Sequence, residues 1–401
     1  MTPMLREFAR RSVSVILQIA VMAALPLAVI VRCFLFIVRV RQISYWTGTP
    51  ILTLSQKAAS ERLLGERTMV VIRSTNRITQ DFDVVLARWC FGRAWLLYPL
   101  SGLAFLWMLA TASRVHTFAD GGILPPVHKG RVATAELLAY RLLRIPLLVW
   151  VYGADVRTRE CTMKLGPYNC CTDCTQVGRA CVCDSQTGDA NILRLRANHA
   201  IVFSMGDMIE YTPGSRNNLF YWPLDLAGKH AAVPVPIASK LDVNHRLRVV
   251  HAPNHREFKG TRHLEDAIRA LQDEGVPIEL VLVEMLPNHE ALDIYRTADV
   301  IFDQCLIGFH GYFALEAMAL GKPVMCYIRK PAEYLLHPEE CPIINTHVDT
   351  LKDDLRRLVS SRHELELIGQ RGRLYVEQHF SREAFAGRLH ETYLDLGILK
   401  K

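Results

Sequence analysis

The 401-residue sequence contains no dense run of lysine and arginine, although its formal net charge is +7. Proteins that bind nucleic acid through their charge usually concentrate it in such runs. We therefore expect no nucleic-acid partner. A mild positive charge is better matched to an anionic membrane surface or to a ligand that carries phosphate groups.

The sequence also lacks the regular cysteine spacing of a disulfide framework. It has 11 cysteines, and an odd number excludes complete pairing. Six of them lie between Cys161 and Cys183, within a polar stretch that also contains glycine. We therefore expect a reducing compartment rather than a disulfide-stabilised secreted protein.

Four cysteines of this cluster form two close pairs, Cys171 with Cys174 and Cys181 with Cys183. Two close pairs of thiolates can satisfy the tetrahedral coordination of Zn²⁺. We expect a structural zinc ion here, and Cys161 or Cys170 can replace any of the four ligands. A redox pair and disulfides are the alternatives. A closed four-cysteine site would have no catalytic role.

The N-terminal segment is strongly apolar. Only Gln18 and Pro26 interrupt residues 12–31, and about 20 apolar residues suffice for a helix to cross a bilayer core of about 30 Å. Basic residues on both sides leave its orientation open. A buried helix is one alternative; a signal peptide is disfavoured because no clean cleavage site follows. We expect residues 1–37 to attach the chain to a membrane, either by crossing it or as a segment kinked at Pro26.

Strand-like and helix-like segments alternate along the remaining sequence. This alternation predicts an α/β fold with parallel sheets and helices on both faces. The chain is long enough for two such domains. We expect strands at residues 38–46, 68–72, 114–118, 147–151, 247–251, 278–283, 299–303 and 323–327. Residues 95–111 are apolar and are expected to form a buried or membrane-apposed helix.

Glycine, proline and other small residues near positions 226–244 indicate a linker between the two halves. The predicted organisation is therefore a membrane-associated segment, a first domain with a cysteine-rich insertion, a linker, a second domain and a C-terminal helix. Their expected boundaries are 1–37, 38–225 with the insertion at 158–186, 226–244, 245–380 and 381–401.

Polar residues follow several predicted strands of the first domain. In open parallel sheets, ligands bind beyond the carboxyl ends of the strands. Asp155 and His116 are therefore candidate catalytic residues, and Gly48 and Thr49 are candidates for ligand contact. A glycine followed by an aspartate can equally form a structural turn closed by a side-chain hydrogen bond, so that alternative stays open for Asp155.

Two loops of the predicted second domain carry stronger signals. The first has Arg256 and Lys259-Gly260 between a strand and a helix. Two cations beside a helix N-terminus are suited to a pyrophosphate. The second places His310 and Gly311 before a helix that carries Glu316 one turn in. That carboxylate can accept hydrogen bonds from sugar hydroxyls.

Residues 308–327 resemble the donor-nucleotide segment of GT-B glycosyltransferases. The family pattern is a glutamate, seven residues, a second glutamate, a helix of small residues and Gly-x-Pro. The second glutamate maps onto Glu316, and Gly308 stands in the place of the first. The helix and the Gly-x-Pro follow at Ala317, Met318, Ala319, Gly321 and Pro323. Arg256 and Lys259-Gly260 resemble the Arg and Lys-Gly pair that holds the donor diphosphate in these enzymes.

The resemblance implies two Rossmann-like domains that face a cleft, with a last helix that crosses back to the first domain. It implies that Arg256 and Lys259 stabilise the departing nucleotide diphosphate without a metal ion. Glu316 would hold the donor ribose, His310 and the Gly311 amide would lie near the sugar or phosphates, and Asp155 would orient the sugar or acceptor. We accordingly treat Asp155, His116 and Glu316 as the catalytic candidates.

The chain looks most like the retaining, family 4-like hexosyltransferases of bacterial surface-polysaccharide assembly. This implies a nucleotide-diphosphate sugar as donor, a glycan or lipid-linked acceptor, and a place at the cytoplasmic face of the inner membrane. Two alternatives remain. Gly308 favours a non-catalytic GT-B protein that binds a sugar nucleotide or acts as a scaffold. A sugar-nucleotide epimerase is less favoured, because a soluble product needs no membrane anchor.

Overall fold

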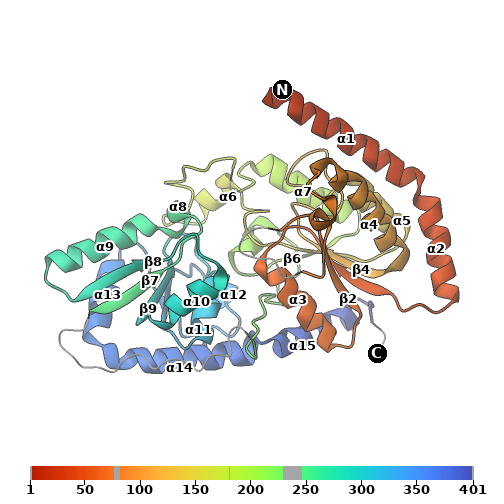
Figure 1. The fold of residues 1–401 in the computed structure, drawn as a ribbon. Coiled ribbons are helices and arrows are strands. Elements are labelled where there is room, and N and C mark those ends of the chain that lie inside the picture. The colour runs from red at the N-terminus through yellow and green to blue at the C-terminus, as the bar shows by residue number, and fades with distance from the viewer. Residues whose placement is uncertain (1, 76–81, 180, 229–245, 400–401) are drawn as a thin grey trace.

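The computed structural model describes residues 2–75, 82–179, 181–228 and 246–399, and it contains two parallel β-sheets with helices packed around them (Figure 1). The prediction of two parallel-sheet α/β domains is confirmed. The predicted linker at 226–244 lies outside the described residues, apart from residues 226–228.

The first sheet has six strands in the order β3-β2-β1-β4-β5-β6. Every ladder in it is parallel. Its strands are β1 (Ile43–Trp46), β2 (Thr68–Ile72), β3 (Val84–Val85), β4 (Ala112–Thr117), β5 (Leu147–Trp150) and β6 (Ile201–Phe203). The helices that accompany them include α3 (Leu52–Leu63), α5 (Thr134–Leu142) and α7 (Ser185–Ala197).

The second sheet has five strands in the order β11-β10-β9-β7-β8, again all parallel. Its strands are β7 (Leu247–His251), β8 (Ile278–Leu282), β9 (Val300–Gln304), β10 (Val324–Cys326) and β11 (Ile344–Asn345). Its helices include α8 (Arg256–Lys259), α9 (Thr261–Asp273), α10 (Asn288–Arg296), α11 (Tyr312–Ala319), α13 (Leu351–Ser360) and α14 (Arg362–His379). On α9, Leu264, Ile268 and Leu271 form the buried stripe that the helical period requires.

The apolar N-terminal run forms two helices rather than one. Helix α1 (Pro3–Ala23) and helix α2 (Leu25–Ile37) meet at an angle of 46°. Pro26 lies in the first turn of α2, where its missing amide proton is tolerated, whereas a continuous helix would lose a backbone hydrogen bond there. The segment is therefore bent just before Pro26, as a broken span or a re-entrant segment would be. Both helices pack along α4 (Leu97–Thr111) of the first domain.

The last helix, α15 (Arg382–Asp395), leaves the second domain after α14 and packs against α3 of the first domain (Figure 1). Tyr393, in the last turn of α15, fixes the helix to the first domain. The Tyr393 hydroxyl donates to Glu61 Oε1 at 2.6 Å and lies 3.1 Å from His116 Nε2. The crossing helix therefore joins the two domains through buried polar contacts.

Glu61 is the centre of this joint and is completely buried. Its carboxylate also accepts from Ser44 Oγ at 2.9 Å, Trp46 Nε1 at 2.6 Å and Arg114 Nε at 2.8 Å. Burial acts to raise the pKa of Glu61, but the neighbouring basic groups and donors outweigh it and hold the pKa well below its usual range. The carboxylate therefore stays ionised and binds elements from both ends of the chain.

We predict that Glu61→Gln lowers the free energy of unfolding by about 3–5 kcal/mol, because it removes the buried charge opposite Arg114. Tyr393→Phe removes one hydrogen bond to that charge and should cost about 1.5–3 kcal/mol. The control is Glu66→Gln: Glu66 also pairs with Arg114 but is partly exposed, so its loss should cost about 1 kcal/mol or less. Urea denaturation measures all three, and equal losses for Glu61→Gln and Glu66→Gln would contradict this account.

Candidate functional site

A cavity of about 500 Å³ lies between the two domains, beyond the carboxyl ends of their strands. In open parallel sheets this is where ligands bind. Residues of the first domain that line it include Leu52, Tyr152, Ala154, Arg157, Asp207 and Trp222. Residues of the second domain that line it include Asn254, Lys259, Asn288, His310, Gly311, Tyr312 and Glu316. The structure thus brings four predicted ligand-contact residues together here: Lys259, His310, Gly311 and Glu316.

Lys259 ends α8 and pairs with a buried carboxylate. Its Nζ lies 2.5 Å from Asp303 Oδ1, at the end of β9, and Asp303 Oδ2 accepts the Gly311 amide at 2.6 Å. Burial acts to raise the pKa of Asp303, but the Lys259 ammonium and the Gly311 amide outweigh it and hold the pKa below its usual value. Asp303 therefore fixes both the lysine and the start of α11 at the cavity wall.

The N-terminus of α11 faces this lysine. The amides of Tyr312 and Phe313 lie in its first turn, where a helix offers no acceptor of its own. His310 precedes it, and His310 Nδ1 lies 3.3 Å from the Gly311 carbonyl oxygen. A carbonyl only accepts, so Nδ1 carries the proton and Nε2 is left as an acceptor. Among the described residues, this buried Nε2 has no partner.

Glu316 lies one turn further into α11 and is 4% exposed. Its Oε1 accepts a hydrogen bond from Asn288 Nδ2 at 3.0 Å, at the start of α10. Both side chains line the cavity. The Glu316 carboxylate can accept hydrogen bonds from vicinal hydroxyl groups, and the Asn288 amide group beside it can donate to them.

The first domain contributes a buried ion pair to the opposite wall. Arg157 Nη2 lies 2.9 Å from Asp207 Oδ2. Arg157 belongs to the loop after β5, whereas Asp207 follows β6. The sequence prediction missed Asp207. Its Gly206-Asp207 dipeptide just beyond a strand is the same kind of signal that was used for Asp155.

Asp155 does not line the cavity. Its Oδ1 accepts the amides of Tyr152 at 2.9 Å and Gly153 at 3.0 Å, and its Oδ2 accepts the Ala119 amide at 3.4 Å. Burial and the neighbouring Asp120 carboxyl raise the pKa of Asp155. The expected contact with substrate is therefore corrected to the alternative role, a buried carboxyl group that closes a structural turn.

His116 is also misplaced by the sequence prediction. Its ring is fully buried and stacks on Trp46 at 3.8 Å, with an angle of 4° between the planes. Its Nδ1 accepts from Trp150 Nε1 at 3.1 Å. His116 is thus a core residue beneath α15 rather than a catalytic one, because both of its ring nitrogens are already engaged.

Gly48 and Thr49 lie in the loop between β1 and α3 of the first domain, and neither lines the cavity. Thr49 Oγ1 donates to Asp120 Oδ1 at 2.8 Å. Gly48 has φ +106°, and a Cβ there would lie 2.9 Å from the Gly121 carbonyl oxygen. This glycine is required by its own loop, so its expected role in ligand contact is corrected to a structural one.

Arg256 points away from Lys259, although only two residues separate them. Its guanidinium pairs with Glu284 at 2.6 Å and with Glu265 at 3.2 Å. Arg256 and Gly260 line a second cavity of about 390 Å³ on the other side of α8. The prediction that Arg256, Lys259 and Gly260 hold one ligand is therefore corrected: in this structure only Lys259 faces the interdomain cavity.

The side chains of the cysteine cluster do not converge on one point in this structure. Among the residues that the structure describes, no three cysteine Sγ atoms lie within 4.8 Å of one another, as zinc ligands would. The expected zinc site of Cys171, Cys174, Cys181 and Cys183 therefore stays a prediction, and none of the four is paired in a disulfide. The segment instead reaches across to the second domain. Cys170 and Cys171 pack into its core beside Phe258 and Leu306, and Tyr168 stacks on His347 at 4.5 Å.

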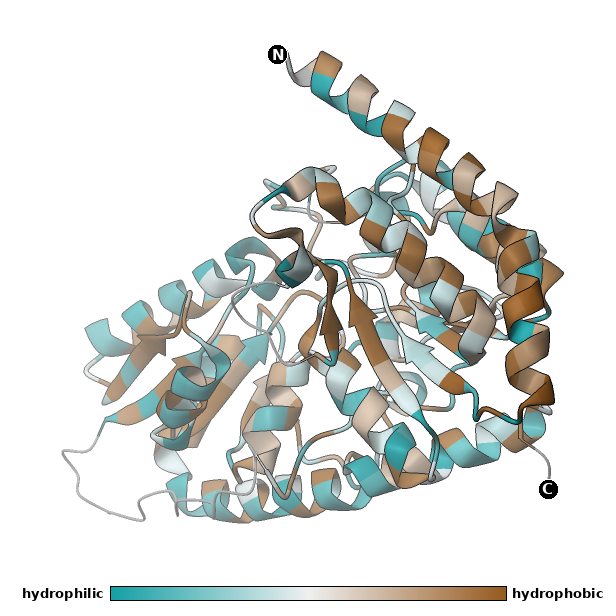
Figure 2. Ribbon diagram, turned by 45° about the vertical axis from the view of Figure 1, so that its right-hand side comes forward, coloured by the Kyte–Doolittle hydropathy of each residue, from teal (hydrophilic) through white to brown (hydrophobic). Residues whose placement is uncertain are grey.

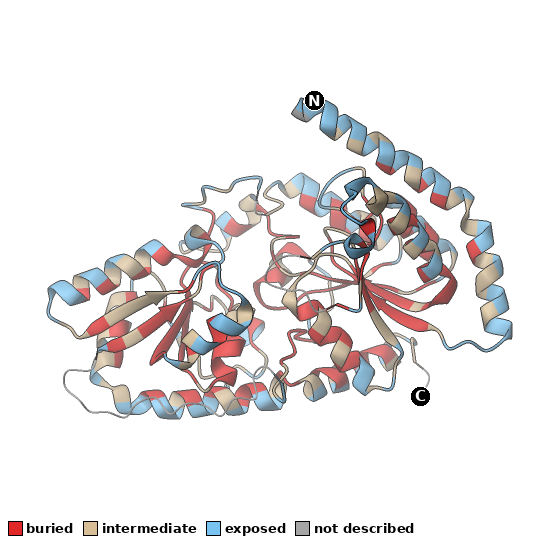
Figure 3. Ribbon diagram, viewed as in Figure 1, coloured by how far each residue is buried: buried red, intermediate tan, exposed pale blue. Residues whose placement is uncertain are grey.

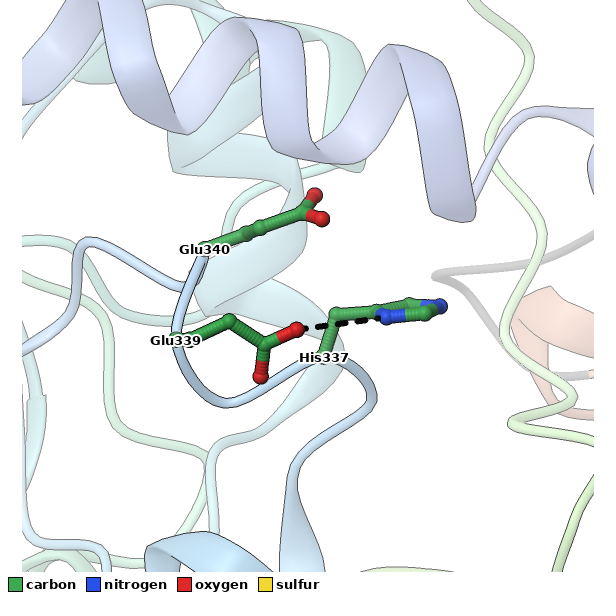
Figure 4. A group of neighbouring side chains, drawn as sticks. All are labelled: His337, Glu339 and Glu340. Atoms are coloured by element: carbon green, nitrogen blue, oxygen red, sulfur yellow. Dashed lines mark ion pairs between the residues drawn. The ribbon is translucent and has the colours of Figure 1, made fainter.

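One group within the described ranges does bring three potential metal donors within 4.8 Å of one another, namely His337, Glu339 and Glu340 (Figure 4). All three are exposed. His337 Nδ1 lies 3.5 Å from Glu339 Oε1, and Glu340 Oε2 lies 2.6 Å from His379 Nε2. These ion pairs account for the arrangement, so we assign no metal to it.

The structure explains why a glycine stands where the family pattern has its first glutamate. Gly308 has φ +90°, a conformation that side chains rarely adopt. A Cβ at this position would lie 2.6 Å from the Arg329 guanidinium carbon. Arg329 thus occupies the space that the first atoms of a glutamate side chain would need. Of the two glutamates in the family pattern, only the second, Glu316, is present in this cavity.

The buried histidines predict an acid-sensitive stability. Burial lowers the pKa of His310 to about 4 and that of His251 to about 4, below the ordinary value of about 6.5. The unfolded chain therefore binds protons between about pH 6.5 and pH 4 that the folded chain does not, so unfolding becomes easier as the pH falls through this window. His310→Asn should reduce that loss, as measured by urea midpoints at pH 7 and pH 4.5. The control is His289→Asn, because His289 is exposed. If the His310→Asn variant loses as much stability between pH 7 and pH 4.5 as the His289→Asn variant does, the assignment is contradicted.

Comparisons with known proteins identify the fold. No protein-family model matches the sequence, and no curated protein matches it. A structure of trehalose-6-phosphate synthase, described as transferring glycosyl groups with retention, aligns over 89% of this chain and 99% of its own, with a TM-score of 0.53 and 11% identity. The glycosyltransferase SnogD from Streptomyces nogalater aligns over 88% of this chain and 99% of its own, with a TM-score of 0.41 and 12% identity.

The alignment with the trehalose-6-phosphate synthase structure covers 89% of this chain and so spans both parallel-sheet domains, and the expected resemblance is confirmed at the level of architecture. The chain has the GT-B fold.

Proposed function

We propose that the protein is a glycosyltransferase that moves a sugar from a nucleotide-diphosphate sugar to an acceptor. The observation that carries this proposal is the joint lining of one interdomain cavity by Lys259, the start of α11 and Glu316. A cation beside helix-terminal amides is suited to a diphosphate. A carboxylate further along the same wall is suited to the ribose hydroxyls of a nucleotide.

The chemical step is departure of the nucleoside diphosphate as the sugar transfers to the acceptor. Negative charge grows on the leaving phosphate oxygens, and the Lys259 ammonium and the amides of Tyr312 and Phe313 stabilise it. Because these groups are already fixed by Asp303 and by α11, they need little reorganisation during the reaction. The leaving group then requires no metal ion. The acceptor nitrogen of His310 receives a hydrogen bond from a donor-sugar hydroxyl.

The acceptor enters from the first-domain wall, where Arg157 and Asp207 lie in the same cavity. We extend the proposal to a hexosyltransferase that retains configuration, with a glycan or lipid-linked acceptor in surface-polysaccharide assembly. Its place would be the cytoplasmic face of the inner membrane. The apolar N-terminal helices support membrane attachment, since they lie on the outside of the first domain.

We predict that a panel of nucleotide sugars in a thermal-shift assay contains a donor that raises the unfolding temperature. For the matching nucleoside diphosphate, Lys259→Met should weaken binding about ten- to a hundredfold, because it removes a charge-assisted contact worth roughly 1.5–3 kcal/mol. Arg256→Met is the matched control and should change affinity little, since its partners are Glu284 and Glu265. Titration calorimetry separates the two, and the reverse ranking would place the donor in the second cavity.

Glu316→Gln should discriminate between parts of the ligand. The substitution keeps the shape of the side chain but removes the negative charge of the carboxylate that accepts hydrogen bonds from the ribose hydroxyls. We expect it to weaken the complete nucleoside diphosphate about tenfold and to leave the binding of inorganic pyrophosphate nearly unchanged. The comparison is made by competition calorimetry on folded protein. A parallel loss for both ligands would show that Glu316 acts on the phosphates instead.

A further inference from the structure

Helices α1 and α2 have the reverse of the usual pattern for helices on a soluble protein. Their inward faces carry small or polar residues: Ser14, Gln18, Val21 and Ala28 are all less than 9% exposed. Their outward faces carry large apolar side chains that are 60–76% exposed: Phe8, Ile16, Ile19, Leu27, Ile30, Phe34 and Ile37. Figure 2 shows hydrophobic residues along both helices, and Figure 3 shows their exposure. Such a face requires a nonpolar partner.

Polar contacts with backbone carbonyls fix the two helices to the first domain. Arg10 donates to the carbonyls of Pro126 at 2.7 Å and Val127 at 2.8 Å. Further along, Gln18 donates to the Pro125 carbonyl at 3.2 Å and accepts the Ala135 amide at 3.3 Å. The helices are therefore docked on the domain rather than extending away from it.

Arg32 of α2 fixes the other end of the helix pair to the first domain. Its Nη1 donates to the carbonyl oxygens of Leu109 at 3.0 Å and Ala112 at 2.8 Å, where α4 ends and β4 begins. The approach is also close in the middle, because a Cβ on Gly102 of α4 would lie 3.0 Å from Leu17. The helix pair thus follows α4 along its length.

These ties argue against a crossing of the bilayer in this conformation. The helical stretch between Gln18 and Arg32 is about 21 Å long at 1.5 Å per residue, and it is bent by 46°. A hydrocarbon core is about 30 Å thick. Both ends of the stretch contact the same domain, so both lie on the same side of a membrane. Helix 94–111 has the length and composition of a span, but 39% of it is buried in the protein.

The surroundings favour a lipid surface over a second protein copy. Exposed aromatic residues accompany the apolar face, with Trp95 and Trp107 on the α4 side at 63% and 56% exposure. Tryptophan is enriched at the boundary between hydrocarbon and water. Arg6, Arg39 and Arg41, on or just after the two helices, are exposed basic residues; Arg11 and Lys129 are exposed too but pair with Glu7. This combination of apolar, aromatic and cationic side chains matches an anionic bilayer surface.

We propose that the outward faces of α1 and α2, together with Trp95 and Trp107, form a monotopic platform that inserts into one leaflet of an anionic bilayer without crossing it. This inference specifies the membrane attachment named in the proposed function. It does not depend on sugar transfer, because lipid binding needs no donor. The protein would then work on acceptors that are held at the same surface.

Vesicle flotation of the full chain tests the platform. We expect strong binding to vesicles of phosphatidylcholine with phosphatidylglycerol and weaker binding to phosphatidylcholine alone. Ile30→Asp with Phe34→Asp should reduce binding at least tenfold, because both side chains lose their apolar burial and gain charge. The control is Leu374→Asp, an equally exposed leucine on α14 of the second domain. The proposal would be overturned if the folded protein does not bind the vesicles and instead forms a dimer that Ile30→Asp dissociates.

Protease access tests the topology. Epitope tags are placed before Met1 and after Lys401, and sealed membrane vesicles of both orientations are prepared from expressing cells. A monotopic platform leaves both tags open to protease from the same side. Digestion of the two tags from opposite sides would show that the N-terminal helices cross the membrane, which would also overturn the proposal. Neither result bears on nucleotide binding, so the two proposals fail separately.

Discussion

The buried carboxylate of Asp303 is the group on which the candidate site depends. It binds the Lys259 ammonium with one oxygen and the Gly311 amide with the other. Removing a carboxylate and an ammonium from water is costly, and only good geometry with further hydrogen bonds offsets that cost. Here one side chain joins the end of β9 to α8 and to the start of α11. The cation and the helix N-terminus are therefore held together before any ligand arrives.

Glu61 has the corresponding role in the other half of the molecule. It joins β1, β4 and α3 to the last turns of α15, so the chain's final helix is secured to the first domain. Helix α15 crosses from the second domain to pack on α3 of the first, and the cysteine-rich segment crosses in the opposite direction to pack near Phe258. A ligand held by Lys259 and Glu316, as we propose, would face Arg157 and Asp207 across the cavity. Catalysis between two domains requires this kind of mutual positioning.

The sequence predicted the second domain better than the first, for physical reasons. Lys259, His310 and Glu316 lie in short strand–loop–helix segments whose local geometry directs them to the cleft. Asp155 and His116 also follow or end strands, but being near a strand end does not decide which way a side chain points. Arg256 was misassigned because Glu284, distant in sequence, competes for it. Cysteine spacing does not determine whether sulfur atoms converge, and a hydropathy run does not reveal that Gln18 and Arg32 bind one domain.

The central claim is that a donor nucleotide binds in the interdomain cavity with its diphosphate at Lys259 and its ribose at Glu316. A crystal structure of the protein with a bound nucleoside diphosphate tests this most directly. We predict phosphate density beside Lys259 Nζ and the first amides of α11, with the ribose within hydrogen-bond distance of Glu316. Density in the second cavity beside Arg256, with the interdomain cavity free of nucleotide, would contradict the account.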